Sequence, residues 1–370
     1  MTRAATLWGA VVTAASLVAV ARSRLARGEA ADGDALTLTI ARPCAGYEED
    51  LSDRLATVGE GLDRARSRVR LGVATEGDGA LAAVRSATER LRDEGVDAAC
   101  LVTHAVTANQ KCGQVAALLE GAGTELVAVV DSDVDLAGFD WRSLAAPMRD
   151  PRVGAVWAPP VEVNGRTPWD RASAAVLGAS LHAFPLLSQI DPAGMVGKVL
   201  LLRREALDVV GGFDALGDVL GEDMALARRL RDAGWKVLAS SQVARAVPRG
   251  RDRERVVSRY ARWVTVIRAQ RPALLASYPL LFFATGPLVA VTARRSPAVA
   301  LSVLAARVLV AREAQRRAGV SRGWSDAVAD AAMADGVLAA AFLRAVTRRT
   351  VEWRGRALRV DAGGVAVSER

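Results

Sequence analysis

Two aspartates separated by one serine stand directly after a short apolar run in the stretch Leu126–Leu136. The run is rich in β-branched residues and ends at Asp131, a pattern typical of a strand buried on both faces of a sheet. Ligands of open α/β sheets bind at the carboxyl ends of such strands. Asp131 and Asp133 can therefore share a divalent cation, since Mg²⁺ is held by one or two carboxylates together with substrate phosphates. A solvated turn is the alternative interpretation.

Two further carboxylate positions follow a predicted strand or begin a predicted helix. Asp78 comes after the strand expected at 69–74, where an N-cap of the next helix is the alternative role. Glu222 and Asp223 begin an amphipathic helix that extends to residue 233. Carboxylates in a first turn also satisfy the helix dipole, so a structural role is the alternative for both.

A basic segment at 254–271 contains Arg259, Arg262 and Trp263. Its apolar side can face inward at a membrane surface while the arginines point to lipid headgroups. Arginine also binds phosphate oxygens through its planar fork, and an indole suits a sugar face or a lipid interface. Trp263 as a simple interfacial anchor is the alternative.

Strands and helices alternate between residues 36 and 135, which predicts a mostly parallel sheet with helices on both faces. Strands are expected at 36–40, 69–74, 98–102, 126–130, 153–160, 194–203 and 235–239, and helices at 80–94, 113–121, 169–183, 205–210 and 220–233. None of the early strands is followed by GxGxxG or GxxxxGK[ST], so the dinucleotide fingerprint and the P-loop are excluded.

The composition indicates no nucleic-acid partner. The 370 residues carry a net charge of +8, almost entirely from arginine, because Lys111, Lys198 and Lys236 are the only lysines. Zinc-finger spacing and a basic heptad region are absent from the sequence. The 3 cysteines show no CxxC spacing, which indicates structural thiols in a reducing compartment.

Apolar segments at both ends predict membrane attachment. Residues 4–21 carry no charge and are followed by Arg22, Arg24 and Arg27, so the positive-inside rule places the next domain in the cytoplasm. A cleaved signal peptide is the alternative. Near the C-terminus, 272–293 is long enough to span, 297–311 is short, and 327–346 is interrupted by charges. The topology of these last segments stays open.

These motifs together resemble the metal-dependent, inverting glycosyltransferases of the GT-A fold, family 2 and its relatives. The element at 259–263 matches their (Q/R)xxRW motif, with Arg259 in the first position. Further stretches are similar to the ceramide glucosyltransferase-like family 21, including its bacterial hopanoid-associated members. They are RPCAG at 42–46, NQK at 109–111, GK at 197–198 with LLLRRE at 200–205, GED at 221–223 and EWRGR at 352–356.

The resemblance implies a role for each motif. Asp223 would be the general base that takes the acceptor's proton, with Glu222 one residue earlier offering the same chemistry. Asp131 and Asp133 would hold Mg²⁺ or Mn²⁺, which stabilises the departing diphosphate, and Asp131 would also lie near the ribose. Asp78 would hold the uracil.

The remaining implied contacts concern the diphosphate and the acceptor. Arg259, Arg262 and Trp263 would close over both of them. Lys111 is expected to order the start of its helix together with Asn109, and a contact to the diphosphate is the alternative that places Lys111 in the nucleotide-sugar site. His182 is interpreted as a structural polar residue.

The implied protein is a multi-pass enzyme of the cell membrane that moves a hexose, glucose or N-acetylglucosamine, from a UDP-sugar to a hydroxyl of a ceramide-, hopanoid- or similar lipid. Its expected parts are an anchor at 1–25, a cytoplasmic GT-A domain at 35–250, a basic interfacial segment at 251–271, membrane segments at 272–346 and a basic tail at 347–370. The alternatives are a polysaccharide synthase, a polyprenyl-phosphate sugar transferase and, more distantly, a non-catalytic nucleotide-binding membrane protein.

Overall fold

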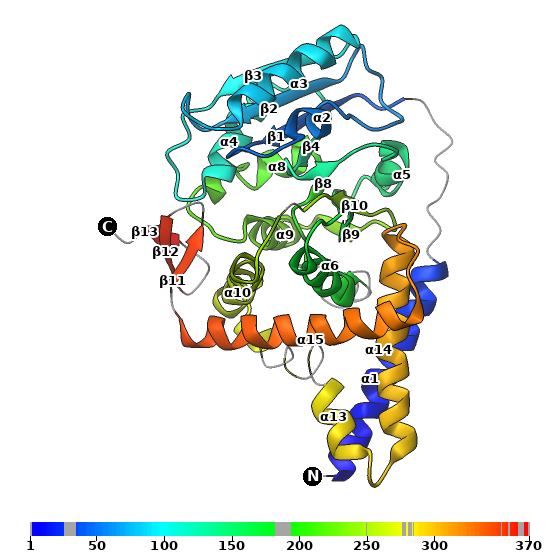
Figure 1. Cartoon of the computed structure of the whole chain (residues 1–370). Helices are drawn as coiled ribbons and strands as arrows, with labels where there is room; N and C mark the ends of the chain where they lie inside the picture. The colour runs from blue at the N-terminus through cyan, green and yellow to red at the C-terminus, as the bar shows by residue number, and fades with distance from the viewer. Residues whose placement is uncertain are drawn as a thin grey trace. The chain divides into compact units, whose positions relative to one another are not determined.

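The computed structural model describes residues 2–25, 35–181, 194–248, 250–275, 279, 283, 285–348, 350–353, 356–361 and 366–368 (Figure 1). The chain divides into two compact units, and both are discontinuous in sequence. We call them the sheet unit, which comprises Gly28–Pro160 and Leu187–Val247, and the helical unit, which comprises Met1–Arg27, Val161–Leu186 and Pro248–Arg370.

The sheet unit contains a seven-stranded sheet in the order β3-β2-β1-β4-β8-β6-β9. Its strands are β1 (Leu38–Pro43), β2 (Arg68–Val73), β3 (Asp97–Val102), β4 (Leu126–Val130), β6 (Val153–Trp157), β8 (Val199–Arg203) and β9 (Lys236–Ala239). The four strands β3, β2, β1 and β4 are parallel to one another, and β6 is parallel to β9. Only β8 runs antiparallel, between β4 and β6, among these strands. The predicted mostly parallel α/β fold is confirmed.

Helices cover both faces of this sheet because its strands are apolar on both sides. The helices are α2 (Leu51–Leu55), α3 (Leu81–Asp93), α4 (Gln110–Leu119), α5 (Trp141–Ala145), α8 (Arg204–Val209) and α9 (Glu222–Asp232), with short 3-10 turns at Ala146–Arg149 and Asp214–Leu216. Leu71 and Val73 of β2 pack in one core cluster with residues of α2 and α3. Gly72 lies between them on the opposite face, where an added Cβ would lie 2.7 Å from Leu118 of α4.

A second, small pairing extends the carboxyl end of the sheet. Strand β5 (Val134–Asp135) follows the Asp131–Asp133 loop and pairs antiparallel with β10 (Ala244–Ala246). Between β5 and β10 in sequence, the chain passes from the sheet unit to the helical unit within β7 (Pro160–Glu162).

The helical unit is built mainly from long helices. They are α1 (Thr2–Leu25), α6 (Pro168–Leu181), α10 (Arg253–Gln270), α11 (Pro272–Leu275), α13 (Thr285–Thr292), α14 (Pro297–Arg317) and α15 (Trp324–Thr347), followed by strands β11 (Thr350–Trp353), β12 (Arg356–Val360) and β13 (Ala366–Ser368). The apolar side of α10 packs with α6 and α15 in one buried cluster that includes Tyr260, Val176 and Leu338. The basic helix therefore has a fixed inner face.

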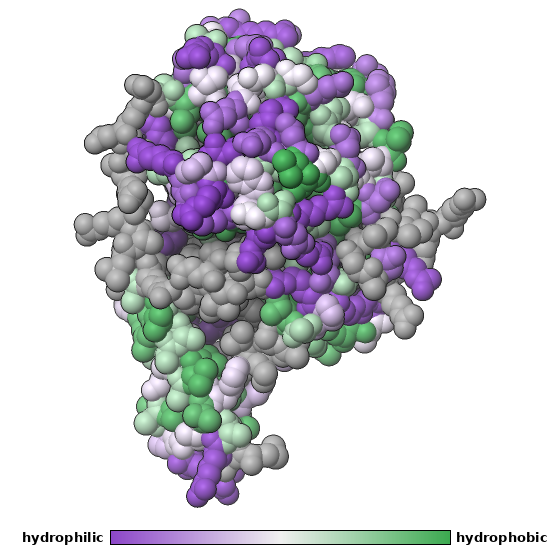
Figure 2. Space-filling view, turned by 180° about the vertical axis from the view of Figure 1, so that it is seen from behind, coloured by the Kyte–Doolittle hydropathy of each residue, from purple (hydrophilic) through white to green (hydrophobic). Residues whose placement is uncertain are grey.

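Helices α1, α13 and α14 lie side by side in this unit (Figure 1). The contact between α1 and α14 is close at Gly9, where an added Cβ would lie 2.8 Å from Val299. Hydrophobic side chains remain on the outside of this bundle (Figure 2), among them Leu7 and Val18 of α1 and Leu301 of α14. Residues Arg3–Ala21 are, of the residues described, the one helical stretch long and apolar enough to cross a membrane.

The charges that interrupt the last apolar segment are paired within the helical unit. Asp330 of α15 accepts from Arg171 of α6 at 2.7 Å, and Asp335 of α15 pairs with Arg307 of α14 at 2.5 Å. These aspartates thus join α15 to two other helices. The predicted span at 272–293 lies partly outside the described residues, and His182 lies wholly outside them.

Several element boundaries differ from the prediction, among them that of β1, which extends to Pro43 rather than ending at residue 40. Helix α4 begins at Gln110 rather than at residue 113, because the Asn109 side chain accepts a hydrogen bond from the Cys112 N–H at 3.3 Å and caps an earlier turn. Strand β8 begins at Val199 rather than at residue 194. The stretch expected as one strand at 153–160 is divided into β6 and β7.

Candidate active site

The Asp131–Asp133 loop lies at the carboxyl end of β4, as the apolar run predicted. Its backbone is fixed at both ends: the Asp131 N–H donates to the Lys198 carbonyl at 3.0 Å, and the Val134 N–H donates to the Asp131 carbonyl at 3.1 Å. The guanidinium of the buried Arg42 donates a hydrogen bond to the Val134 carbonyl, which follows the loop, at 2.6 Å. These bonds hold both carboxylates in place.

The Lys198 ammonium lies between the two aspartates. Its Nζ is 2.6 and 2.7 Å from the two carboxylate oxygens of Asp133 and 2.9 Å from Oδ2 of Asp131. The loop therefore already binds one cation through both of its carboxylates. This arrangement was not predicted, although the GK stretch was noted for its resemblance.

Lys111 approaches Asp131 from the other side, at 2.8 Å from Oδ1. It also lies 3.0 Å from Oε1 of Glu222 and donates to the Gly197 carbonyl at 3.2 Å. Burial disfavours the charge of Lys111, but Asp131 and Glu222 outweigh it and raise the pKa of the ammonium. Lys111 is thus a fixed cation that joins the start of α4 to the start of α9.

Glu222 and Asp223 occupy the first turn of α9 but differ in their surroundings. Glu222 pairs with Lys111 and accepts from the Asn109 side chain at 3.1 Å. Asp223 accepts from two backbone N–H groups, those of Gly197 and Met224, each at 2.8 Å. Burial and the neighbouring charge of Glu222 raise the pKa of Asp223 to about 6. For Glu222, burial is outweighed by Lys111, and its pKa is lowered.

The donor set at Asp131 and Asp133 fits a divalent cation. Both carboxylates are mostly buried and converge on one positively charged atom, the Lys198 Nζ. Among the described residues, no three His, Cys, Asp or Glu side chains form a complete metal site. Two carboxylates are nevertheless sufficient where substrate phosphates supply the remaining ligands, as is usual for Mg²⁺.

Asp78 lies in the same unit but contacts another loop. Its Oδ1 accepts from the Gly46 N–H at 2.8 Å and from the Ala80 N–H at 2.9 Å. The side chain therefore ties the loop after β1 to the start of α3. A role for Asp78 in holding uracil stays a prediction.

The RxxRW residues belong to the helical unit, where α10 carries all three. The Arg259 guanidinium pairs with the fully buried carboxylate of Glu162 and lies 5.4 Å from the Trp263 ring centroid. Arg251 reaches the same Glu162 oxygen at 2.6 Å. Burial of Glu162 is outweighed by these two arginines, which lower its pKa to about 2. Arg262 is half-buried on the same helix.

Lys111, Asp131, Asp133 and Asp223 are thus brought together within the sheet unit, and Arg259 and Trp263 form a separate cluster in the helical unit. Sequence reasoning missed Arg42, Lys198 and Glu162. The signals available were the RPCAG and GK stretches, which place Arg42 and Lys198 in motifs of the resembled family. Nothing in the sequence marked Glu162.

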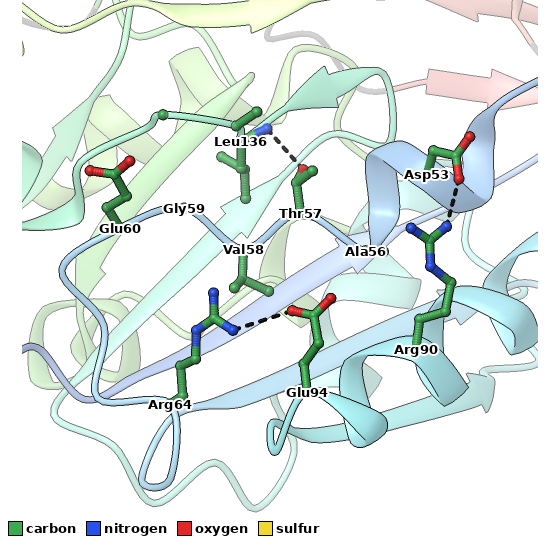
Figure 3. A pocket seen from close by; sticks show the side chains of 12 residues that line it. Asp53, Ala56, Thr57, Val58, Gly59, Glu60, Arg64, Arg90, Glu94 and Leu136 are labelled. Atoms are coloured by element: carbon green, nitrogen blue, oxygen red, sulfur yellow. Dashed lines mark hydrogen bonds and ion pairs between the residues drawn. The ribbon is translucent and has the colours of Figure 1, made fainter.

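A pocket of about 310 Å³ lies elsewhere in the sheet unit (Figure 3). Two ion pairs line it, Arg64–Glu94 at 3.2 Å and Arg90–Asp53 at 2.5 Å, and Thr57 is another lining residue. None of the predicted site residues lines it.

The fold is of the GT-A type found among glycosyltransferases. Among solved structures, the fold is similar to that of the mannosyltransferase PcManGT from Pyrobaculum calidifontis, a complex with GDP-Man and Mn²⁺, with a TM-score of 0.50, 18% identity, and coverage of 94% of this chain and 99% of that chain. S. aureus TarS 1-349 matches with a TM-score of 0.42 and 14% identity over 90% and 99% of the two chains.

Residues 2–366 match the sequence profile of glycosyl transferase family 21, and the chain belongs to that family. The predicted resemblance and the predicted enzyme class, a glycosyltransferase, are both confirmed.

Proposed function

We propose that the protein is a membrane-bound, inverting glycosyltransferase that moves a hexose from a UDP-sugar to a hydroxyl group of a lipid. The observation that carries the proposal is the position of Asp223. In a family 21 chain, this carboxylate is linked through Gly197 and Lys111 to the cation-binding pair Asp131 and Asp133. A base and a cation site thus meet within one unit.

Each residue has a distinct part in such a transfer. A cation bound to Asp131 and Asp133 would neutralise charge that develops on the departing diphosphate. Asp223 accepts the proton of the attacking hydroxyl, and its raised pKa keeps the carboxylate basic near neutral pH. Lys111 holds Asp131 in position, and its charge also lies near the diphosphate site.

The acceptor class is proposed from the helical unit. Its bundle of α1, α13 and α14 leaves large apolar side chains exposed, and α1 is long enough to cross the hydrocarbon core. Arg259, Arg262 and Trp263 stand on a basic helix of the same unit, where they suit a diphosphate, a sugar or lipid headgroups. We therefore propose a lipid acceptor and a multi-pass protein of the cell membrane with its catalytic domain in the cytoplasm.

Transfer by the purified full-length protein in lipid nanodiscs tests this proposal. The protein is incubated with Mn²⁺ and radiolabelled UDP-glucose, UDP-N-acetylglucosamine or UDP-galactose, and ceramide or a hydroxylated hopanoid is supplied as acceptor. We expect one of the three UDP-sugars to yield a radiolabelled lipid. Release of UDP without labelled lipid would contradict the lipid acceptor, and labelled polymer would indicate a polysaccharide synthase.

Membrane attachment is tested on its own. We expect membranes that contain the protein to retain it through carbonate extraction, with its N-terminal segment intact. A soluble protein that lacks this segment would show that residues 4–21 are a cleaved signal peptide.

A further inference from the structure

The three close oxygen neighbours that the described residues give the Lys198 ammonium all belong to Asp131 and Asp133. The ammonium donates two hydrogen bonds to Asp133 and forms an ion pair with Asp131, so three carboxylate oxygens surround its three N–H donors. The Lys198 side chain is only 11% exposed, and the two carboxylates are 17% and 23% exposed. The ion cluster is therefore shielded from water. Charges in such a site interact more strongly than they do in bulk water.

Lys111 makes a different set of contacts. Besides Asp131, it has Glu222 and the Gly197 carbonyl as partners, and neither belongs to the Asp131–Asp133 loop. If a divalent cation bound to both aspartates, Lys111 would keep two of its three partners, whereas Lys198 would lose all of those described. The two lysines thus have unequal dependence on the same loop.

We propose that Lys198 is a built-in counter-ion of the metal site: it occupies the cation position between Asp131 and Asp133 and is displaced when a divalent metal binds. Without a cation, two adjacent carboxylates in a mostly buried loop would repel each other. The ammonium removes that repulsion in the metal-free protein, and a metal must then compete with it. The inference rests on the proposed function, because it assigns these aspartates to the metal.

The displaced ammonium needs a new anionic partner, and the donor diphosphate supplies one. Lysine suits this exchange because its charge is carried at the end of a flexible stem. We therefore expect metal and nucleotide to bind more tightly together than either binds alone. Weak binding of metal without nucleotide follows directly from the competition.

Metal binding without nucleotide is the first test. The full-length protein in detergent is titrated with Mn²⁺, and free Mn²⁺ is measured by electron paramagnetic resonance. Lys198→Met removes the competing charge, and we expect it to tighten Mn²⁺ binding by about 10- to 100-fold, the scale of one hydrogen bond to a charged group. Lys236→Met is the matched control, because Lys236 pairs with Asp150 at 2.8 Å on the surface and should leave Mn²⁺ binding unchanged.

Lysine labelling of the wild-type protein is the second test and needs no variant to fold. The chain has only Lys111, Lys198 and Lys236, so acetic anhydride labelling followed by mass spectrometry reports each site separately. We expect added Mn²⁺ to raise the labelling of Lys198 several-fold, while Lys111 stays protected and Lys236 stays reactive.

Equal Mn²⁺ affinity in the wild type and Lys198→Met, or Lys198 labelling that Mn²⁺ leaves unchanged, would overturn the proposal. Neither measurement needs a sugar donor or a lipid. If sugar is transferred to lipid and either of these negative results is obtained, the counter-ion role of Lys198 is refuted and the proposed function is retained. Displacement of Lys198 by Mn²⁺ in a protein that transfers no sugar would do the reverse.

Discussion

The Asp223 carboxylate accepts a hydrogen bond from the Gly197 N–H at 2.8 Å, and Gly197 directly precedes the lysine that neutralises Asp131 and Asp133. One turn of backbone, from Val196 to Lys198, therefore connects the proposed base with the proposed metal ligands. A Cβ at Gly197 would lie 3.3 Å from the Asp223 Cβ, so any larger residue there would press against the Asp223 side chain. This turn therefore helps to set the distance between the Asp223 carboxylate and the Asp131 and Asp133 carboxylates.

Replacement of Asp223 by Asn separates catalysis from capping. The amide keeps the shape and can still accept from the Gly197 N–H, but it cannot take a proton. We expect transfer to fall by about 10²- to 10⁴-fold, the usual contribution of a general base, while UDP binding by calorimetry stays near normal. Glu222→Gln is the matched control and should be milder. Wild-type transfer in Asp223→Asn with none in Glu222→Gln would move the base one residue back.

The pH profile of transfer should report the same carboxyl group. Burial first and the charge of Glu222 second raise the pKa of Asp223 to about 6. The base acts only when deprotonated, so kcat/KM should be half-maximal near pH 6, level off at higher pH, and approach a tenfold fall per pH unit well below the pKa. In Glu222→Gln the charge that raises the pKa of Asp223 is lost, and the charge of Lys111, which lowers this pKa, remains. The acidic limb should therefore move to lower pH, and a limb that does not move would contradict this origin.

Removal of the metal or its ligand should stop transfer. Asp133→Ala deletes one of the two carboxylates, and we expect its turnover to fall by several orders of magnitude, as should that of the wild type in excess EDTA. Mn²⁺ or Mg²⁺ should restore the chelated wild type but not the variant. Full activity of Asp133→Ala in EDTA would show that the reaction needs no metal at this loop.

Glu162 should matter for stability because two arginines share its buried carboxylate. Glu162→Gln removes the negative charge beside Arg251 and Arg259, and loss of one partner from a buried ion pair costs about 3–5 kcal/mol of unfolding free energy. Glu254→Gln is the control, since Glu254 pairs with Arg344 at an exposed site where a pair contributes about 0–1 kcal/mol. Thermal unfolding in detergent measures the stability of both variants. Equal melting temperatures for Glu162→Gln and Glu254→Gln would contradict the stabilising role of the Glu162 ion pairs.

Local patterns in the sequence were sufficient for many elements of the sheet. Strand β4 has the predicted bounds, Leu126–Val130, because an apolar β-branched run is ended sharply by Asp131. Helix α9 begins at the predicted carboxylates for a similar reason, since Gly221 adopts φ +79° and stops the preceding turn. Such features depend on neighbours in the chain.

The position of Lys198 between Asp131 and Asp133 was not predictable because it depends on strand order. Strand β8 inserts antiparallel between β4 and β6, and the register places Val199 opposite Val130. Lys198 and Asp131 are the next residues on each strand, so this pairing alone sets them together. Likewise, Glu162 and Arg259 lie almost a hundred positions apart and meet only through tertiary packing. No local pattern carries such information.

The pairing of α1 with α14 has a consequence for the order in which the chain is assembled. Leu25 is synthesised long before Pro297, and at roughly 5–20 residues per second the interval is on the order of 15–55 s. During that time the sheet unit is completed on the ribosome, while the first helix has yet to meet its partner. The narrow contact at Gly9 can therefore form only after Val299 has been synthesised, and until then the first helix depends on its surroundings to shield its apolar surface.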